Sequence, residues 1–242
     1  MKEVLYTIPM NDAMNAGGEC PFCNIEKDVE QDLLDFVLGS GSSYMEADVR
    51  SDTDAEGFCR NHFKKMFAYG NTLGNGWILK THYMRINEQL SNEIKHFGVG
   101  KSSLFKKNPD AGNSMTRWVR EKENSCYICK RYNETYERYI ATFFHMYKND
   151  SEFVAKLKAG NGFCLSHFGD ICEGAERYLS EKERKDFYPL VFNLMSENMK
   201  RMQADVAWLV EKFDYVNRDA DWKNSKDAVQ RGMQKLKGGI YD

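Results

Sequence analysis

The sequence has no excess of charge of either sign. Its 242 residues contain 34 Lys and Arg against 36 Asp and Glu, which gives a formal net charge of −2. Affinity for nucleic acids comes mostly from Lys and Arg side chains that neutralise phosphates. The balance therefore argues against a general polyanion binder, and we discount a nucleic-acid partner.

Long apolar runs are also missing. The chain contains no stretch of roughly 18 consecutive apolar residues, the length that a transmembrane helix requires. Residues 1–9 include an early acid and a proline where a signal peptide needs a continuous apolar run. We expect a soluble, cytoplasmic protein with no membrane partner.

Proline is scarce, with four residues in the whole chain, so long stretches are free to form helices. No segment shows the two-residue alternation that is typical of strands. Hydrophobic residues make up 42% of the chain, which is enough to bury a core. These features predict an all-α fold. The seven cysteines are an odd number without an export signal, which argues against a disulfide scaffold.

Six of the seven cysteines belong to an internal duplication. The segment GFCRNHF at residues 57–63 returns as GFCLSHF at residues 162–168. A Cys-x-x-Cys precedes each copy, at residues 20–23 and 126–129, and the offset between copies is nearly constant. Self-similarity at one offset is the mark of a repeated structural unit.

Each copy supplies three thiols and one imidazole, a Cys₃His set that is typical of a closed structural zinc site. The sequence therefore predicts two zinc ions per chain. We expect each ion to be held within one repeat, the first by Cys20, Cys23, Cys59 and His62 and the second by Cys126, Cys129, Cys164 and His167. A crosswise pairing, in which the Cys-x-x-Cys of one copy shares an ion with the Cys-x-x-His of the other, would use the same residues.

The cysteines also allow roles apart from zinc binding. The segment CPFC at residues 20–23 resembles a glutaredoxin-type redox motif, but the second copy lacks the proline and no βαβ pattern surrounds either copy. An iron–sulfur cluster with one histidine ligand is an alternative to zinc. Cys172 has no counterpart in the first copy, and we predict that it is a buried core thiol.

Hydrophobic residues follow each Cys-x-x-Cys at helical spacing. The segment between each Cys-x-x-Cys and the next Cys-x-x-His is therefore predicted to begin with an amphipathic helix. Residues 98–125 are rich in Gly, Ser and Asn, which is typical of a linker. We therefore predict a helical bundle with a first zinc-pinned unit at 1–97, a linker at 98–125, and a second unit with C-terminal helices at 126–242.

A methionine-rich stripe lies in the last third of the chain, where apolar residues step by three and four: Met195, Met199, Met202, Val206, Leu209 and Phe213. This spacing predicts one long helix, with a kink at Pro189 before the stripe. The stripe could form a homodimer seam, although a helix that covers the core of its own chain is the commoner arrangement.

No catalytic residue can be assigned. The sequence has no Ser-His-Asp order, P-loop or Gly-x-Gly-x-x-Gly. The segment from Glu46 through Asp48 to Arg50 could position a polar ligand or act in acid–base chemistry. We expect instead a solvated loop with a local Asp48–Arg50 ion pair.

Several segments together resemble an uncharacterised bacterial family, the domain-of-unknown-function 6062 family. They lie at residues 6–13, 20–23, 45–50, 57–63 and 213–215. The resemblance covers nearly the whole chain and implies a bacterial cytosolic protein with paired Cys/His motifs, but it implies no activity.

The leading interpretation is a structural-zinc protein that serves as an interaction or ligand-binding scaffold for a protein or small molecule. The alternative is a thiol-based redox or metal sensor, or an enzyme that uses the cysteine motifs or residues 46–50.

One stretch departs from the family pattern: residues 75–82 are more polar than the apolar run ending in histidine that the family usually has.

Overall fold

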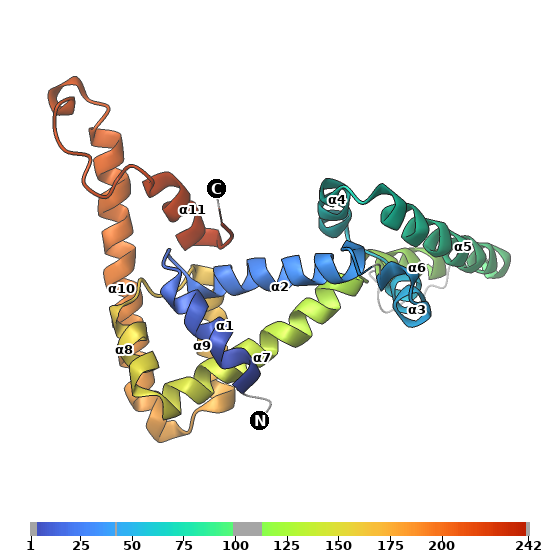
Figure 1. Ribbon diagram of the computed structural model, residues 1–242, viewed down its shortest axis with the longest axis horizontal. Coiled ribbons are helices and arrows are strands. Elements are labelled where there is room, and N and C mark those ends of the chain that lie inside the picture. Colours follow the sequence, from blue (N-terminus) through green and yellow to red (C-terminus); the bar gives the residue numbers. More distant parts are fainter. Residues whose placement is uncertain (1–3, 42, 99–112, 241–242) are drawn as a thin grey trace, which may run out of the picture. The chain divides into compact units, whose positions relative to one another are not determined.

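The computed structural model describes residues 4–41, 43–98 and 113–240, and within them the chain is all-α, as predicted (Figure 1). This part of the chain has eleven α-helices and no strand. The helices are α1 (Val4–Asn15), α2 (Pro21–Leu38), α3 (Ala47–Glu56), α4 (Arg60–Tyr69), α5 (Thr72–His96), α6 (Ser114–Glu123), α7 (Tyr127–Asn149), α8 (Ser151–Ala159), α9 (Leu165–Tyr178), α10 (Glu181–Glu211) and α11 (Ala228–Lys237). Two short 3₁₀ helices are η1 (Ser43–Met45) and η3 (Tyr215–Asn217).

The helices form two compact units. The terminal unit contains Met1–Val29 and Thr135–Asp242, and the central unit contains Glu30–Glu134. Helices α2 and α7 each contribute residues to both units. The central unit is thus one continuous stretch of sequence, whereas the terminal unit is assembled from the two ends of the chain.

These units do not follow the order of the repeats. The predicted division at 1–97, 98–125 and 126–242 places one complete motif set in each unit, but each compact unit takes its segments from both copies. Of the predicted linker, residues 99–112 lie outside the described part of the chain. Ser114–Glu123 forms helix α6 instead of an irregular linker, with the side chain of Asn113 capping its first turn.

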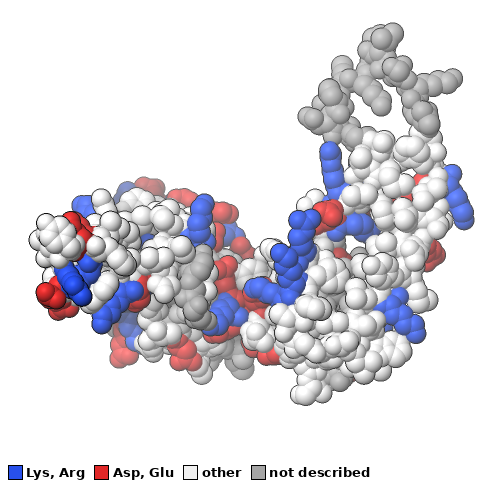
Figure 2. Space-filling model, turned by 90° about the horizontal axis from the view of Figure 1, so that it is seen from above, with Lys and Arg blue, Asp and Glu red and all other residues white. Residues whose placement is uncertain are grey.

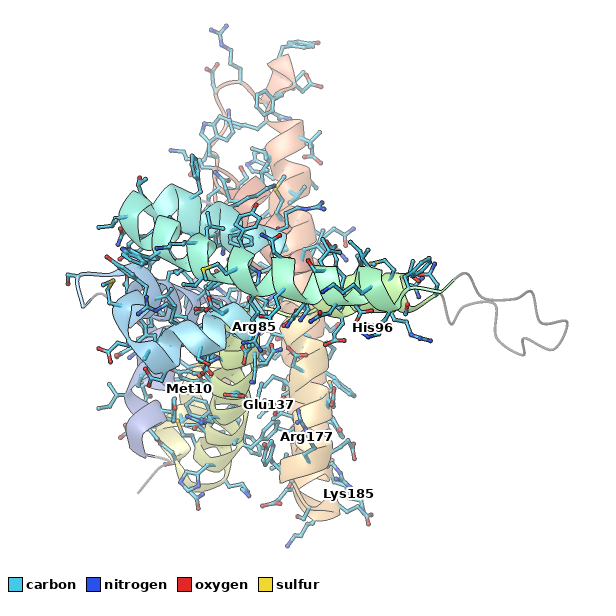
Figure 3. All side chains as sticks on the ribbon, turned by 90° about the vertical axis from the view of Figure 1, so that its right-hand side faces the viewer. Met10, Arg85, His96, Glu137, Arg177 and Lys185 are labelled. Atoms are coloured by element: carbon cyan, nitrogen blue, oxygen red, sulfur yellow. The ribbon has the colours of Figure 1, made fainter. Side chains whose placement is uncertain are left out.

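The core of the terminal unit is aromatic. The ring of Phe143 on α7 lies between 5.2 and 6.4 Å from five other phenylalanine rings, measured between centroids. These five rings, all fully buried, are Phe22, Phe144, Phe153, Phe163 and Phe187. Each contributes about 1.5–3 kcal/mol through burial. On the surface of the unit, Arg177 on α9 reaches Glu137 on α7 at 2.8 Å (Figure 3).

The central unit has a smaller apolar core. Its buried members come from α2, η1, α3, α4, α5 and the start of α7: Leu34, Val37, Leu38, Tyr44, Val49, Phe58, Met66, Ile78, Cys126, Tyr127 and Ile128. The N–H of Tyr127 donates to the carbonyl of Gly57 at 2.9 Å, which ties the start of α7 to the segment before α4. This core therefore brings the second Cys-x-x-Cys beside the first Cys-x-x-His.

The long C-terminal helix is present as α10, which begins with a capping box between Ser180 and Glu183 and contains Pro189. Met195 and Met202 are buried, but Phe213 lies beyond the helix end and is 80% exposed. The predicted stripe is therefore wrong at its last residue, because the helix ends at Glu211. The homodimer seam stays a prediction.

The surface agrees with the near-neutral composition. Lys and Arg side chains and Asp and Glu side chains are both spread over the face shown in Figure 2. In the described part of the chain, no helix combines the length and the apolar character needed to cross a lipid bilayer.

Candidate metal centres

In the terminal unit, four side chains form the first Cys/His cluster, the terminal centre. It consists of Cys20, Cys23, Cys164 and His167, whose ligand atoms all lie within 4.8 Å of one another. The Nδ1 atom of His167 is 3.2 Å from the Sγ atoms of Cys20 and Cys164 and 3.7 Å from that of Cys23. All four residues are buried.

The second cluster, the central centre, lies in the central unit. It consists of Cys59, His62, Cys126 and Cys129, again with all ligand atoms within 4.8 Å. His62 Nδ1 is 3.2 Å from the Sγ atoms of Cys59 and Cys126 and 3.4 Å from that of Cys129. The Sγ atoms of Cys59 and Cys129 are 3.8 Å apart.

The expected pairing within each repeat is therefore wrong. Each Cys-x-x-Cys meets the Cys-x-x-His of the other copy. The apolar cores account for this pairing. In the central unit, the shared core and the hydrogen bond from the Tyr127 N–H to the Gly57 carbonyl bring the second Cys-x-x-Cys beside the first Cys-x-x-His. In the terminal unit, the rings of Phe22 and Phe163 pack 6.1 Å apart between centroids, which brings the first Cys-x-x-Cys beside the second Cys-x-x-His.

The distances within both centres fit a tetrahedral zinc ion. With Zn–S near 2.3 Å and Zn–N near 2.05 Å, a regular tetrahedron has S···N edges of about 3.6 Å and S···S edges of about 3.8 Å. The observed Nδ1–Sγ distances of 3.2–3.7 Å and the Sγ–Sγ distance of 3.8 Å lie close to these edges. Each centre could hold one metal ion.

Helix N-termini position the sulfur ligands. Cys20 and Cys126 directly precede α2 and α7, and Cys59 and Cys164 are the N-cap residues of α4 and α9. The N–H of His167 donates to the Sγ of Cys164 at 3.5 Å. The partial positive charge at a helix N-terminus stabilises a thiolate. A Cys-x-x-Cys or Cys-x-x-His spanning a helix start therefore presents its ligands in a form that binds metal.

The glycine of the repeated segment has a backbone role. Gly57 and Gly162 have φ angles of 62° and 77°, in the left-handed region that favours glycine. A Cβ at Gly57 would lie 2.8 Å from Cε1 of His82, and a Cβ at Gly162 would lie 3.0 Å from Sδ of Met195. The repeated glycine thus permits the turn that leads into each Cys-x-x-His.

Replacing Gly162 with alanine is expected to destabilise the terminal unit by about 1–2 kcal/mol, because a side chain at this φ is strained. Chemical denaturation of the metal-loaded protein measures the change. Gly169 is a matched control in α9, since a Cβ there meets no atom within 4 Å and its φ is not positive. Gly169→Ala is expected to leave stability unchanged or raise it slightly. Equal destabilisation by both substitutions would contradict this role.

Each histidine also has a carboxylate on its other ring nitrogen. His62 Nε2 is 3.0 Å from Oε1 of Glu30, and His167 Nε2 is 3.4 Å from Oε2 of Glu26. Such a carboxylate fixes the ring orientation of a metal-binding histidine and raises its basicity. Glu30 also pairs with Lys65. Neither glutamate was predicted from the sequence, because neither is repeated in the second copy.

The family model matches residues 1–242, and its description is a family of unknown function. The chain belongs to the domain-of-unknown-function 6062 family (DUF6062). No match was found among curated proteins or among solved structures. The resemblance predicted from the sequence is thus confirmed over the whole chain, and membership of DUF6062 assigns no activity to it.

In the central centre, close contacts between ligands shift their pKa values. Burial alone would lower the pKa of His62, but its hydrogen bonds with Cys126 and Glu30 raise it to about 10. Burial would raise the pKa of Cys126, but hydrogen bonds from His62 and from backbone N–H groups lower it to about 6. Burial and the neighbouring Cys126 raise the pKa of Cys129 to about 12. Without a metal, one thiolate therefore lies beside a protonated imidazole.

Contacts between ligands also shift the pKa values in the terminal centre. Burial would lower the pKa of His167, but hydrogen bonds with Cys164 and Cys20 raise it to about 12. Hydrogen bonds from Cys20 and Cys23 hold the pKa of Cys164 well below its usual range. Burial raises the pKa of Cys20, and the hydrogen bond with Cys164 raises the pKa of Cys23 to about 12. A metal ion entering this centre must displace the protons on the other groups.

A buried ionic network holds the segment before the terminal centre. Glu19 is fully buried and pairs with Arg201 on α10 and with Arg231 and Lys235 on α11, the last two at 3.2 and 3.7 Å. A Cβ at Gly238, just after α11, would lie 3.4 Å from the Sγ of Cys164. The end of α11 therefore covers the sulfur atoms of the terminal centre. The charges of this network gave no recognisable pattern in the sequence.

The segment considered for acid–base chemistry is helical. Glu46 is the N-cap of α3, so the expected solvated loop is wrong. Arg50 donates to the carbonyl of Met45 at 2.9 Å, and Asp48 accepts from the N–H of Val49 at 2.9 Å. These contacts stabilise the start of the helix locally. Separately, Cys172 on α9 is partly exposed, so the predicted buried core thiol is wrong.

Proposed function

We propose that the protein binds two structural zinc ions and serves as an interaction or ligand-binding scaffold. The observation that carries this proposal is the placement of each histidine. Its Nδ1 atom lies against three cysteine sulfurs, and its Nε2 atom lies against a glutamate carboxylate. This arrangement is typical of zinc centres in which an outer carboxylate orients the ligand.

The ligand count supports a structural role over a catalytic one. A catalytic zinc usually has three protein ligands and an open position for water. Each centre here offers four protein ligands. A Cys₃His set also suits zinc better than an iron–sulfur cluster, which is commonly held by four cysteines.

Metal analysis of the full chain, purified without chelator, tests this proposal. We expect two zinc ions per chain, and we expect both to resist dialysis against metal-free buffer. Clearly fewer than two ions per chain, or iron in place of zinc, would contradict it.

A further inference from the structure

The two centres differ in how well their sulfur atoms are covered. In the terminal centre, no cysteine is more than 1% exposed. In the central centre, Cys126 is buried but Cys59 and Cys129 are both partly exposed. The repeats supply the same ligand types, so the difference comes from what packs over each centre.

In the terminal unit, the end of α11 and two aromatic rings cover the ligands. The rings of Phe22 and Tyr136 each lie 5.7 Å from the ring of His167, measured between centroids. Gly238 brings the backbone after α11 close enough to Cys164 that a Cβ would lie 3.4 Å from its Sγ. This packing leaves Cys20, Cys23 and Cys164 almost without solvent exposure.

In the central unit, a hollow of about 480 Å³ opens beside Cys59. Its walls come from the start of α4 and from α6, and the lining residues are Phe58, Cys59, Arg60, Asn61, Trp118, Val119, Lys122 and Glu123. Arg60 and Lys122 bring two positive charges to this wall, against one carboxylate. Reactive cysteines are found where a thiolate is partly exposed and near positive charge.

The two partly exposed cysteines are also neighbours. Their Sγ atoms are 3.8 Å apart, whereas a disulfide bond is about 2.05 Å long. The sulfurs are therefore already in contact before any bond forms.

We propose that Cys59 and Cys129 form a peroxide-sensitive dithiol that releases the metal of the central centre, an inference that rests on the proposed zinc binding. The thiolate of Cys59 attacks one oxygen of hydrogen peroxide, which breaks the O–O bond and gives a sulfenic acid and hydroxide. The thiolate of Cys129 then attacks that sulfur, forms the S–S bond and expels a second hydroxide. Two electrons pass from the sulfurs to peroxide, whose two oxygens and two hydrogens leave as the two hydroxides.

The product explains the metal release. Zinc in this centre loses two of its four ligands at once, and His62 and Cys126 alone hold it weakly. The terminal centre keeps all four ligands under the same treatment. The protein would therefore lose one ion per chain on oxidation and bind it again after reduction of the disulfide.

The test treats the zinc-loaded full chain with hydrogen peroxide while a chromogenic chelator reports free zinc. We expect one ion per chain to appear at least about ten times faster than the second. Peptide mass mapping should find a Cys59–Cys129 disulfide that a thiol reductant removes. Release of both ions at one rate, no release, or a disulfide at other cysteines would overturn the proposal.

Matched histidine substitutions separate the two centres. Cys129→His keeps four protein ligands but removes the second thiol, so fast release should fall at least about tenfold. Cys23→His changes the corresponding ligand of the terminal centre and should leave fast release unchanged. If the purified chain holds fewer than two zinc ions, the proposed function fails. The disulfide mapping needs no metal and still decides whether this dithiol exists.

Discussion

Replacing Cys59 with alanine is expected to remove one zinc ion per chain while Cys20 and Cys23 stay protected from alkylation. Cys59 lies in the central centre, and the other two cysteines belong to the terminal centre. The central unit should lose most of its folding free energy, because structural zinc contributes about 10–16 kcal/mol of apparent binding in small zinc domains. Metal analysis, with alkylation mapped by mass spectrometry, measures both effects.

The control substitution is Cys164→Ala, which should give the opposite pattern. It should remove the other ion, expose Cys20 and Cys23, and leave Cys126 and Cys129 protected. Cys172→Ala should keep both ions. If Cys59→Ala instead exposed Cys20 and Cys23, the ligands would be paired within each repeat, and the crosswise arrangement would be refuted.

Acidification is expected to weaken metal binding steeply at both centres. Without metal, His62 and Cys129 have pKa values of about 10 and 12, so both carry protons at neutral pH. Binding must release at least these two protons, so the affinity of the central centre should fall at least about 100-fold for each pH unit lost. In the terminal centre, His167, Cys20 and Cys23 all have raised pKa values, so metal binding releases three protons. The metal affinity of this centre should therefore fall about 1000-fold for each pH unit lost.

Competition with a chelator between about pH 6.5 and 8, corrected for the chelator's own protonation, tests this dependence. The sign follows from the raised pKa values, since these groups hold protons that compete with the metal as the pH falls. Below about pH 6, the pKa of Cys126 is also crossed, and the central slope should steepen. An affinity that does not change with pH would contradict the protonation states described for the centres.

The ligand types were predictable because a duplicated Cys-x-x-Cys and Cys-x-x-His is typical of metal binding and rare by chance. The helix starts beside them were predictable from hydrophobic spacing after each Cys-x-x-Cys. The pairing was not, because both pairings use the same eight residues. It depends on which apolar core each motif packs into, and spacing in sequence does not show which segments will share a core.

The glutamates beside the histidines and the helix that covers the terminal centre could not be predicted from the sequence either. Glu26 and Glu30 resemble any other acid on the exposed face of a helix until the histidines are placed. The same holds for Glu19, whose three cationic partners lie on α10 and α11, far along the chain. The family match adds no activity, so the contrast between the centres could be found only from their packing.

The crosswise pairing also sets an order for biosynthesis. The central unit is a continuous stretch, so its centre has all its ligands once Cys129 has been made. Cys20 and Cys23 are translated first but must wait for Cys164 and His167 before they can close their own centre. Because domains fold as the chain emerges, the central centre should load its ion first. During that interval the earliest cysteines of the nascent chain remain without their partners.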